Sequence, residues 1–76
     1  MTLSKKKEIA DAADMIVGGY AYKRNGQNIR VVNLNKTVPG IMTFTEDGNI
    51  LESSMDPIER QIAIDRWDEN KEFMDF

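Results

Sequence analysis

Residues 20–32 read YAYKRNGQNIRVV, and this stretch decides the fold. Asn25-Gly26 separates two runs that are rich in aromatic and β-branched residues. Both central residues of a type I′ turn need positive φ, and Asn-Gly is the pair that meets this need most readily. We therefore predict a β-hairpin in which Tyr22 lies opposite Ile29.

The two faces of this hairpin differ in chemistry because side chains alternate along a strand. One face collects Tyr20, Tyr22, Ile29 and Val31, and the other collects Ala21, Lys23, Asn28, Arg30 and Val32. A platform for nucleic-acid bases needs aromatic and cationic side chains on the same open surface. Since the tyrosines and the cations fall on opposite faces, we expect the tyrosines in a core covered by a helix.

A second hairpin is predicted for residues 41–53, IMTFTEDGNILES. With Asp47-Gly48 as the loop, Phe44 lies opposite Leu51. A turn at Gly48-Asn49 with a bulge would shift this register, and the sequence leaves both arrangements open.

Helices are predicted before and after the hairpins. Residues 3–17 carry apolar residues at helical spacing, and Gly18-Gly19 would end that helix by supplying a left-handed residue. A phosphate loop would need a strand before the glycines and a helix after them, the reverse of this order.

Residues 56–59, DPIE, place Asp at the N-cap, Pro at N1 and Glu at N3 of a helix that runs to about residue 72 or 73. The apolar arc of this second helix is predicted to be Ile58, Ile62, Ala63 and Trp67.

These elements predict a single small α+β domain over residues 1–76. Its order is a helix, a four-stranded antiparallel meander made of two hairpins, and a second helix. Both helices are expected on one face of the sheet.

The composition excludes much chemistry. The chain has no histidine and no cysteine, which removes the commonest general base and the usual metal ligands. Catalysis by carboxylates alone stays open, but we expect no enzyme, no cofactor and no metal. The acidic stripe Asp65, Asp68, Glu69 and Glu72 is interpreted as a solvated face. With no apolar leader and no long apolar run, we expect a soluble cytoplasmic protein with no membrane partner.

Charge is segregated along the chain. Residues 15–45 contain four Lys or Arg and no acid, whereas residues 46–76 contain ten acids against three bases. This pattern could present a basic sheet face to an anionic partner, or the two regions could neutralise one another within the fold or between subunits. A chain with a net charge of −3 and a pI near 4.8 is a poor general binder of nucleic acid.

The leading hypothesis is a non-catalytic protein-interaction or regulatory module that self-associates as a homodimer. Its candidate contacts are Trp67, Phe73, Met74, Lys23 and Arg30. The apolar tail that ends at Phe76 either folds back over the sheet or forms an exposed patch. The expected dimer is twofold, with the cations against Glu52 or the acidic helix of the other copy and Trp67 or the tail at its centre.

Two alternatives belong to other classes. The first is a nucleic-acid-associated regulator that uses the cations Lys23, Arg24, Arg30 and Lys36. The second, which is weaker, is an enzyme that works with carboxylates alone.

Overall fold

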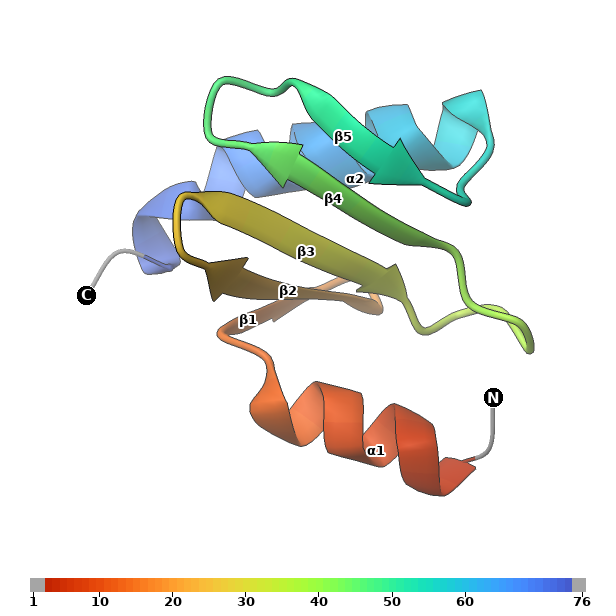
Figure 1. Cartoon of the computed structure of the whole chain (residues 1–76). Helices are drawn as coiled ribbons and strands as arrows, with labels where there is room; N and C mark the ends of the chain where they lie inside the picture. The colour runs from red at the N-terminus through yellow and green to blue at the C-terminus, as the bar shows by residue number, and fades with distance from the viewer. Residues whose placement is uncertain (1–2, 75–76) are drawn as a thin grey trace.

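The computed structural model describes residues 3–74 and contains five strands between two helices (Figure 1). In chain order the elements are α1 (Leu3–Ala12), β1 (Met15–Val17), β2 (Tyr20–Asn25), β3 (Asn28–Asn33), β4 (Ile41–Thr45), β5 (Ile50–Ser53), α2 (Pro57–Asn70) and a 3-10 turn, η1 (Lys71–Phe73). The strands form one antiparallel sheet in the order β1-β2-β3-β4-β5. The predicted α+β class is confirmed, with five strands where four were expected.

The additional strand comes from the segment predicted as the end of the first helix. The helix α1 stops at Ala12, and Met15–Val17 pairs with β2 as β1. Gly18 and Gly19 have φ of +57° and +82°, so they form the turn of a hairpin in which Val17 faces Tyr20. The helix-stop interpretation was wrong because two glycines suit a type I′ turn as well as a helix end.

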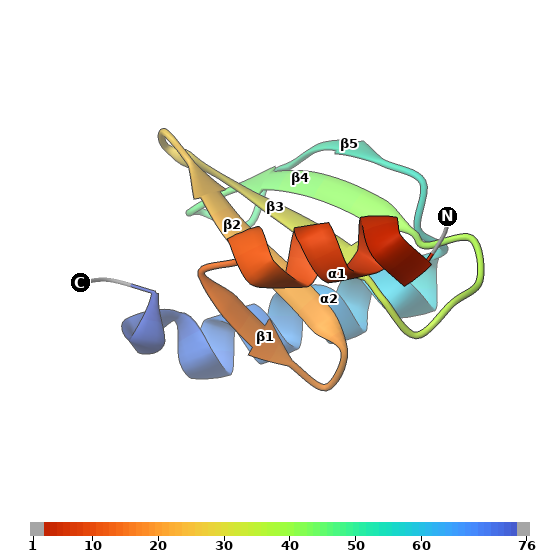
Figure 2. The ribbon, with the colours of Figure 1, turned by 90° about the horizontal axis from the view of Figure 1, so that it is seen from below.

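The two helices lie on opposite faces of the sheet, which corrects the prediction that both share one face. Helix α2 runs behind β3, β4 and β5 in Figure 1, and it contributes Ala63 and Trp67 to the core. Figure 1 places helix α1 at the β1 and β2 end of the sheet, away from α2, and in the view from below α1 crosses in front of β2 (Figure 2). Its Ala12 carbonyl accepts a hydrogen bond from Lys23 Nζ at 3.1 Å, on the face that points away from the core.

The first hairpin has the predicted faces but a shifted register. Its turn is Gly26-Gln27, flanked by the pair Asn25 and Asn28, and Gly26 alone takes a positive φ there, +65°. Tyr22 therefore pairs with Val31 rather than with Ile29. Because the partner moves by two positions, each side chain keeps its face. The prediction that Tyr20, Tyr22, Ile29 and Val31 are buried together is confirmed.

The second hairpin is shifted from its predicted register, but it has neither of the two predicted turns: the Gly48 N–H donates to the Thr45 carbonyl at 2.9 Å, so the loop is residues 46–48. Phe44 pairs with Ile50, and an irregularity between Thr43 and Phe44 interrupts the register, so the pairing with Leu51 was wrong. The Thr45 N–H donates to the Asn49 carbonyl at 2.9 Å and closes the loop. All four residues of β5 are exposed.

The core lies between the inner face of the sheet and α2. Phe44 and Trp67 meet edge to face, with ring centroids 5.2 Å apart and an interplanar angle of 82°, the geometry that aromatic pairs prefer. The Tyr22 hydroxyl, fully buried, donates to the Ala63 carbonyl at 2.6 Å. This bond ties the second strand directly to the helix.

The start of α2 is as predicted, but its buried stripe is not. Asp56 is the N-cap, and its carboxylate accepts from the Glu59 N–H at 2.8 Å. The stripe that faces the sheet is Glu59, Ala63 and Trp67. Ile58 and Ile62 face outward, with exposed fractions of 73% and 37%. The sequence pattern put them in the apolar arc because a glutamate was not expected in the core.

Candidate partner-binding groove

A groove of about 350 Å³ lies between α1 and the outer face of the sheet. Its lining comes from α1, the residue after it and three strands: Lys5, Ile9, Ala13, Ala21, Lys23, Arg30, Val32 and Ile41. The lining is mostly apolar with a few polar groups, which is typical of binding sites.

The strand register explains how this groove is built. Ala21 pairs with Val32, and Val32 pairs with Ile41, so one apolar row crosses β2, β3 and β4. Two residues further along, Lys23 pairs with Arg30 and forms a cationic row beside it. Paired residues project on the same face, so the alternation of β2 and β3 places a cationic row beside an apolar floor.

Helix α1 covers the apolar row. Ile9 and Ala13 are half-buried against it, and they lie one helical turn apart in the chain. The Lys23 ammonium group holds the last turn of α1 through the Ala12 carbonyl, where a cation is favoured by the helix dipole. Lys23 thus both anchors the helix and contributes charge to the groove.

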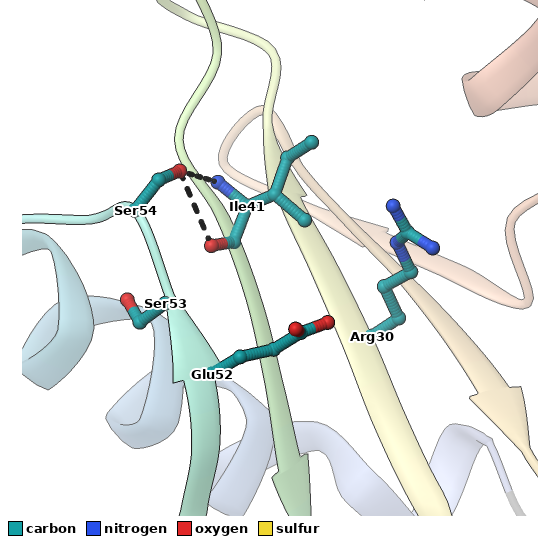
Figure 3. A pocket seen from close by; sticks show the side chains of 5 residues that line it. All are labelled: Arg30, Ile41, Glu52, Ser53 and Ser54. Carbon is teal, nitrogen blue, oxygen red and sulfur yellow. Dashed lines mark hydrogen bonds between the residues drawn. The ribbon is translucent and has the colours of Figure 1, made fainter.

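A second, more open hollow of about 370 Å³ adjoins the groove and shares Arg30 and Ile41 with it (Figure 3). Its remaining lining is Glu52, Ser53 and Ser54. In Figure 3 the Glu52 carboxylate extends from β5 toward Arg30. The Arg30 guanidinium therefore stands at the junction of the two hollows, where a ligand in either could reach it.

Lys23 and Arg30 are the two predicted contacts that the structure brings together. Both are exposed. Trp67 and Met74 lie in the core under the opposite face, 4% exposed each, so a partner could touch them only if the chain moved. Phe73 is 60% exposed, whereas Met74 folds back, so the tail adopts both predicted arrangements in part. Phe76 lies outside the described residues.

The cations of the nucleic-acid hypothesis do not share one surface. Arg24 pairs with Glu46, near Trp67 and away from the groove. Lys36 pairs with Glu59 and lies 4.0 Å from Asp56. Each is thus engaged by an acid of the chain, which leaves Lys23 and Arg30 as the cations of the outer sheet face.

Sequence reasoning missed the buried carboxylate of Glu59. It accepts hydrogen bonds from Lys36 Nζ and from Asn33 Nδ2, the latter at 3.1 Å. The hydrogen bond from Lys36 is the main reason that the pKa of Glu59 falls to about 2, and the bond from Asn33 adds to it. A Cβ at position 40 would stand 2.9 Å from Glu59 Oε2, so Gly40 leaves room for the carboxylate.

This cluster ties the loop between β3 and β4 to the start of α2. A carboxylate that stays ionised down to about pH 2 is a poor general base, since catalytic bases work best near the operating pH. The signal that could have revealed it is Glu59 itself, a charged residue in register with Ala63 and Trp67 on one helix face. We interpret the cluster as structural.

Other chemistry finds no support in residues 3–74. No group of three acidic side chains there is arranged to hold a metal ion. The acids of the α2 stripe have ordinary surface partners, with Gln61 donating to Asp65 and Lys71 to Asp68. Over the same residues, neither helix has the length and apolar character needed to cross a bilayer.

The fold and the groove define a small α+β protein in which an antiparallel five-stranded meander has one helix on each face. The chain belongs to DUF7723, a family of unknown function whose pattern covers residues 3–74. No curated protein and no solved structure matches it.

Proposed function

We propose that this protein is a non-catalytic interaction module whose binding surface is the groove between α1 and the outer face of the sheet. The observation that carries the proposal is that the half-buried apolar residues Ile9 and Ile41 line the same groove as the cationic pair Lys23 and Arg30. Such a surface can bury an apolar group and bind an anion in one contact.

The ligand that fits is a protein segment with an apolar side chain flanked by carboxylates. The apolar side chain would lie against Ile9 and Ile41, which are half-buried, because Val32 is only 5% exposed beneath α1. A carboxylate beside it would meet Arg30, whose planar group can bind it through two parallel hydrogen bonds. The attraction between Arg30 and this carboxylate would orient the segment and speed its association with the groove, while the apolar contact supplies most of the affinity.

Nucleic acid is a less suitable ligand. Phosphate neutralisation dominates such binding, and it needs several cations along one track. Here Arg24 and Lys36 are paired with acids, and the chain carries a net charge of −3. A carboxylate-based enzyme has no comparable support, because Glu59, the acid with the strongly shifted pKa, is held by Lys36.

Fluorescence anisotropy with short labelled peptides tests the proposal. One set combines leucine or isoleucine with aspartate and glutamate, and a matched set replaces the acids by lysine. We expect the acidic set to bind, more weakly as salt rises, and Arg30→Glu to abolish binding. Lys7→Glu makes the same charge change on an exposed α1 residue outside the groove and should bind as the wild type does.

The proposal fails if no acidic apolar peptide binds, or if Arg30→Glu and Lys7→Glu weaken binding equally. A titration with single-stranded and duplex DNA at low salt tests the nucleic-acid alternative. DNA binding that is lost on reversal of Arg24 and Lys36 would favour the nucleic-acid alternative instead.

A further inference from the structure

We propose that the segment received by the groove is the outward face of α2 from a second copy of this chain. This inference rests on the proposed function and names its partner. It commits the protein to head-to-tail association, in which the groove of one copy binds the helix of the next.

The outward face of α2 has the apolar groups that the groove requires. Ile58 and Ile62 are one helical turn apart and are 73% and 37% exposed. They lie outside the buried stripe formed by Glu59, Ala63 and Trp67, and they take no part in the core. Adjacent exposed isoleucines on the helix of a small domain are typical of an association surface.

The same face has the charges that the groove lacks. Asp65 and Glu69 continue the row of Ile58 and Ile62 at the spacing of successive helical turns, and both are exposed. A shallow hollow on this face is lined by Ile62, Asp65, Arg66 and Glu69. The Arg66 guanidinium extends toward Gly18, since a Cβ there would be 3.1 Å from it.

The two surfaces are complementary in both respects. The groove offers an apolar floor with the cations Lys5, Lys23 and Arg30, and the helix face offers two isoleucines followed by two carboxylates. This contact would explain why charge is segregated along the sequence. The basic segment 15–45 builds most of the groove, and the acidic segment 46–76 builds the helix of the next copy that binds in it.

The position of the two surfaces fixes the type of association. The groove lies on the outer face of the sheet, and α2 lies on the inner face with Ile58 and Ile62 exposed outside the core. A contact between different surfaces is heterologous, so each added copy leaves one groove and one helix face unoccupied. The assembly then continues to add copies, unless the copies close into a ring. This differs from the twofold dimer expected from sequence.

Sedimentation velocity at low salt, from micromolar to millimolar protein, tests the inference. A contact of one groove with one helix face is smaller than a standard interface of about 1,600 Å², so association should be weak and should increase with concentration. We expect the average mass of the wild type to rise past that of a dimer, or to reach a ring, and to fall when salt is added.

Two variants separate the partners. Arg30→Glu alters the groove while keeping the Lys23 bond to α1, and the pair Ile58→Gln with Ile62→Gln alters the helix face with a good helix-forming residue. Each alone should weaken self-association by roughly ten-fold or more. An equimolar mixture should form a one-to-one dimer that grows no further, because one intact groove and one intact helix face remain.

The matched controls are Lys7→Glu and Val38→Gln. Val38 is 78% exposed and lies in the loop before β4, so its replacement removes an apolar surface group outside both partners. These controls should associate as the wild type does.

Three results would overturn the inference: a wild type that stays monomeric, growth that ends at a twofold dimer, or a mixture that does not pair. If acidic peptides still bind the groove in an Arg30-dependent way, the proposed function stands and only the identity of the partner is wrong. If the peptides do not bind while the copies associate through other surfaces, both statements fall.

Discussion

Replacement of Glu59 by glutamine should destabilise the fold at neutral pH, although the side chain keeps its shape. Glu59 is 7% exposed, and its carboxylate accepts hydrogen bonds from Lys36 and Asn33. Glutamine can retain one of these bonds but has no charge to pair with the ammonium group. The loop between β3 and β4 would then lose its attachment to α2.

The magnitude follows from the pKa of Glu59. The hydrogen bond from Lys36, supported by the one from Asn33, lowers it from the ordinary 4.5 to about 2. Each pKa unit corresponds to about 1.4 kcal/mol, which sets an upper value of about 3 kcal/mol for the ionised group. Because the side chain of Lys36 is half exposed, water screens part of the attraction. We therefore expect a cost of about 1–3 kcal/mol at pH 7.

The pH dependence has a definite sign. A depressed folded-state pKa contributes stability above pH 4.5, and this contribution disappears as pH falls toward 2. Glutamine does not titrate, so the gap between wild type and variant should shrink by about half by pH 3.

Urea unfolding followed by the fluorescence of Trp67, the single tryptophan, measures this gap at pH 7 and pH 3. The control is Glu72→Gln, which neutralises an exposed carboxylate and should cost little. Equal stabilities of Glu59→Gln and wild type at pH 7 would refute the reasoning. So would a gap that stays constant down to pH 3.

Three further predictions concern the fold, all measured by urea unfolding. Tyr22→Phe should cost about 0.5–1.5 kcal/mol, because it removes the buried hydrogen bond to the Ala63 carbonyl, and no loss would mean that this bond is not formed. Gly19→Ala should cost about 1–3 kcal/mol more than Gly26→Ala. Both have positive φ, but only at position 19 would the new methyl group meet a side chain: it would lie 2.3 Å from Asn35 Oδ1, and displacing Asn35 breaks its 2.9 Å hydrogen bond to the Gly18 carbonyl. Asp56→Ala should cost about 1 kcal/mol through loss of the α2 N-cap, whereas Asp56→Ser should cost much less.

The predictable parts of the fold are those set by local chemistry. The faces of the first hairpin followed from alternation, and they survived a wrong turn position because the error moved each partner by two residues. The start of α2 followed from Asp56 and Pro57, whose roles depend on neighbouring backbone groups alone. Burial of Tyr20 and Tyr22 followed from the same alternation.

The errors arose where one local signal suits two structures. Gly18-Gly19 fits a helix end and a type I′ turn, and the apolar residues before it fit both periods over so short a span. Strand pairing decided the outcome, since Ile16 and Val17 are β-branched and find partners in Ala21 and Tyr20.

The candidate site was half predictable. That Lys23 and Arg30 share a face could be read from the sequence, and they are cross-strand partners in the structure. The sequence could not show that α1 crosses to the same face and makes a groove there. Nothing in the sequence of a helix indicates which side of a sheet it will cover. The Glu59 cluster likewise depends on where the β3–β4 loop brings Lys36.

The strand order has a consequence for how the chain folds. Every strand pairs with its neighbours in sequence, so each pairing closes a short loop and costs little chain entropy. Sheets built from such local contacts form faster than sheets of similar size with distant pairings. The sheet can therefore form one hairpin at a time. The bond from Tyr22 to Ala63 spans 41 residues, and β3, β4 and β5 lie between the two residues in the chain, so we expect it to form after these strands have paired. Since α2 covers the inner face of the sheet, we expect that face to stay exposed until α2 docks, and the chain to be most prone to aggregate before then.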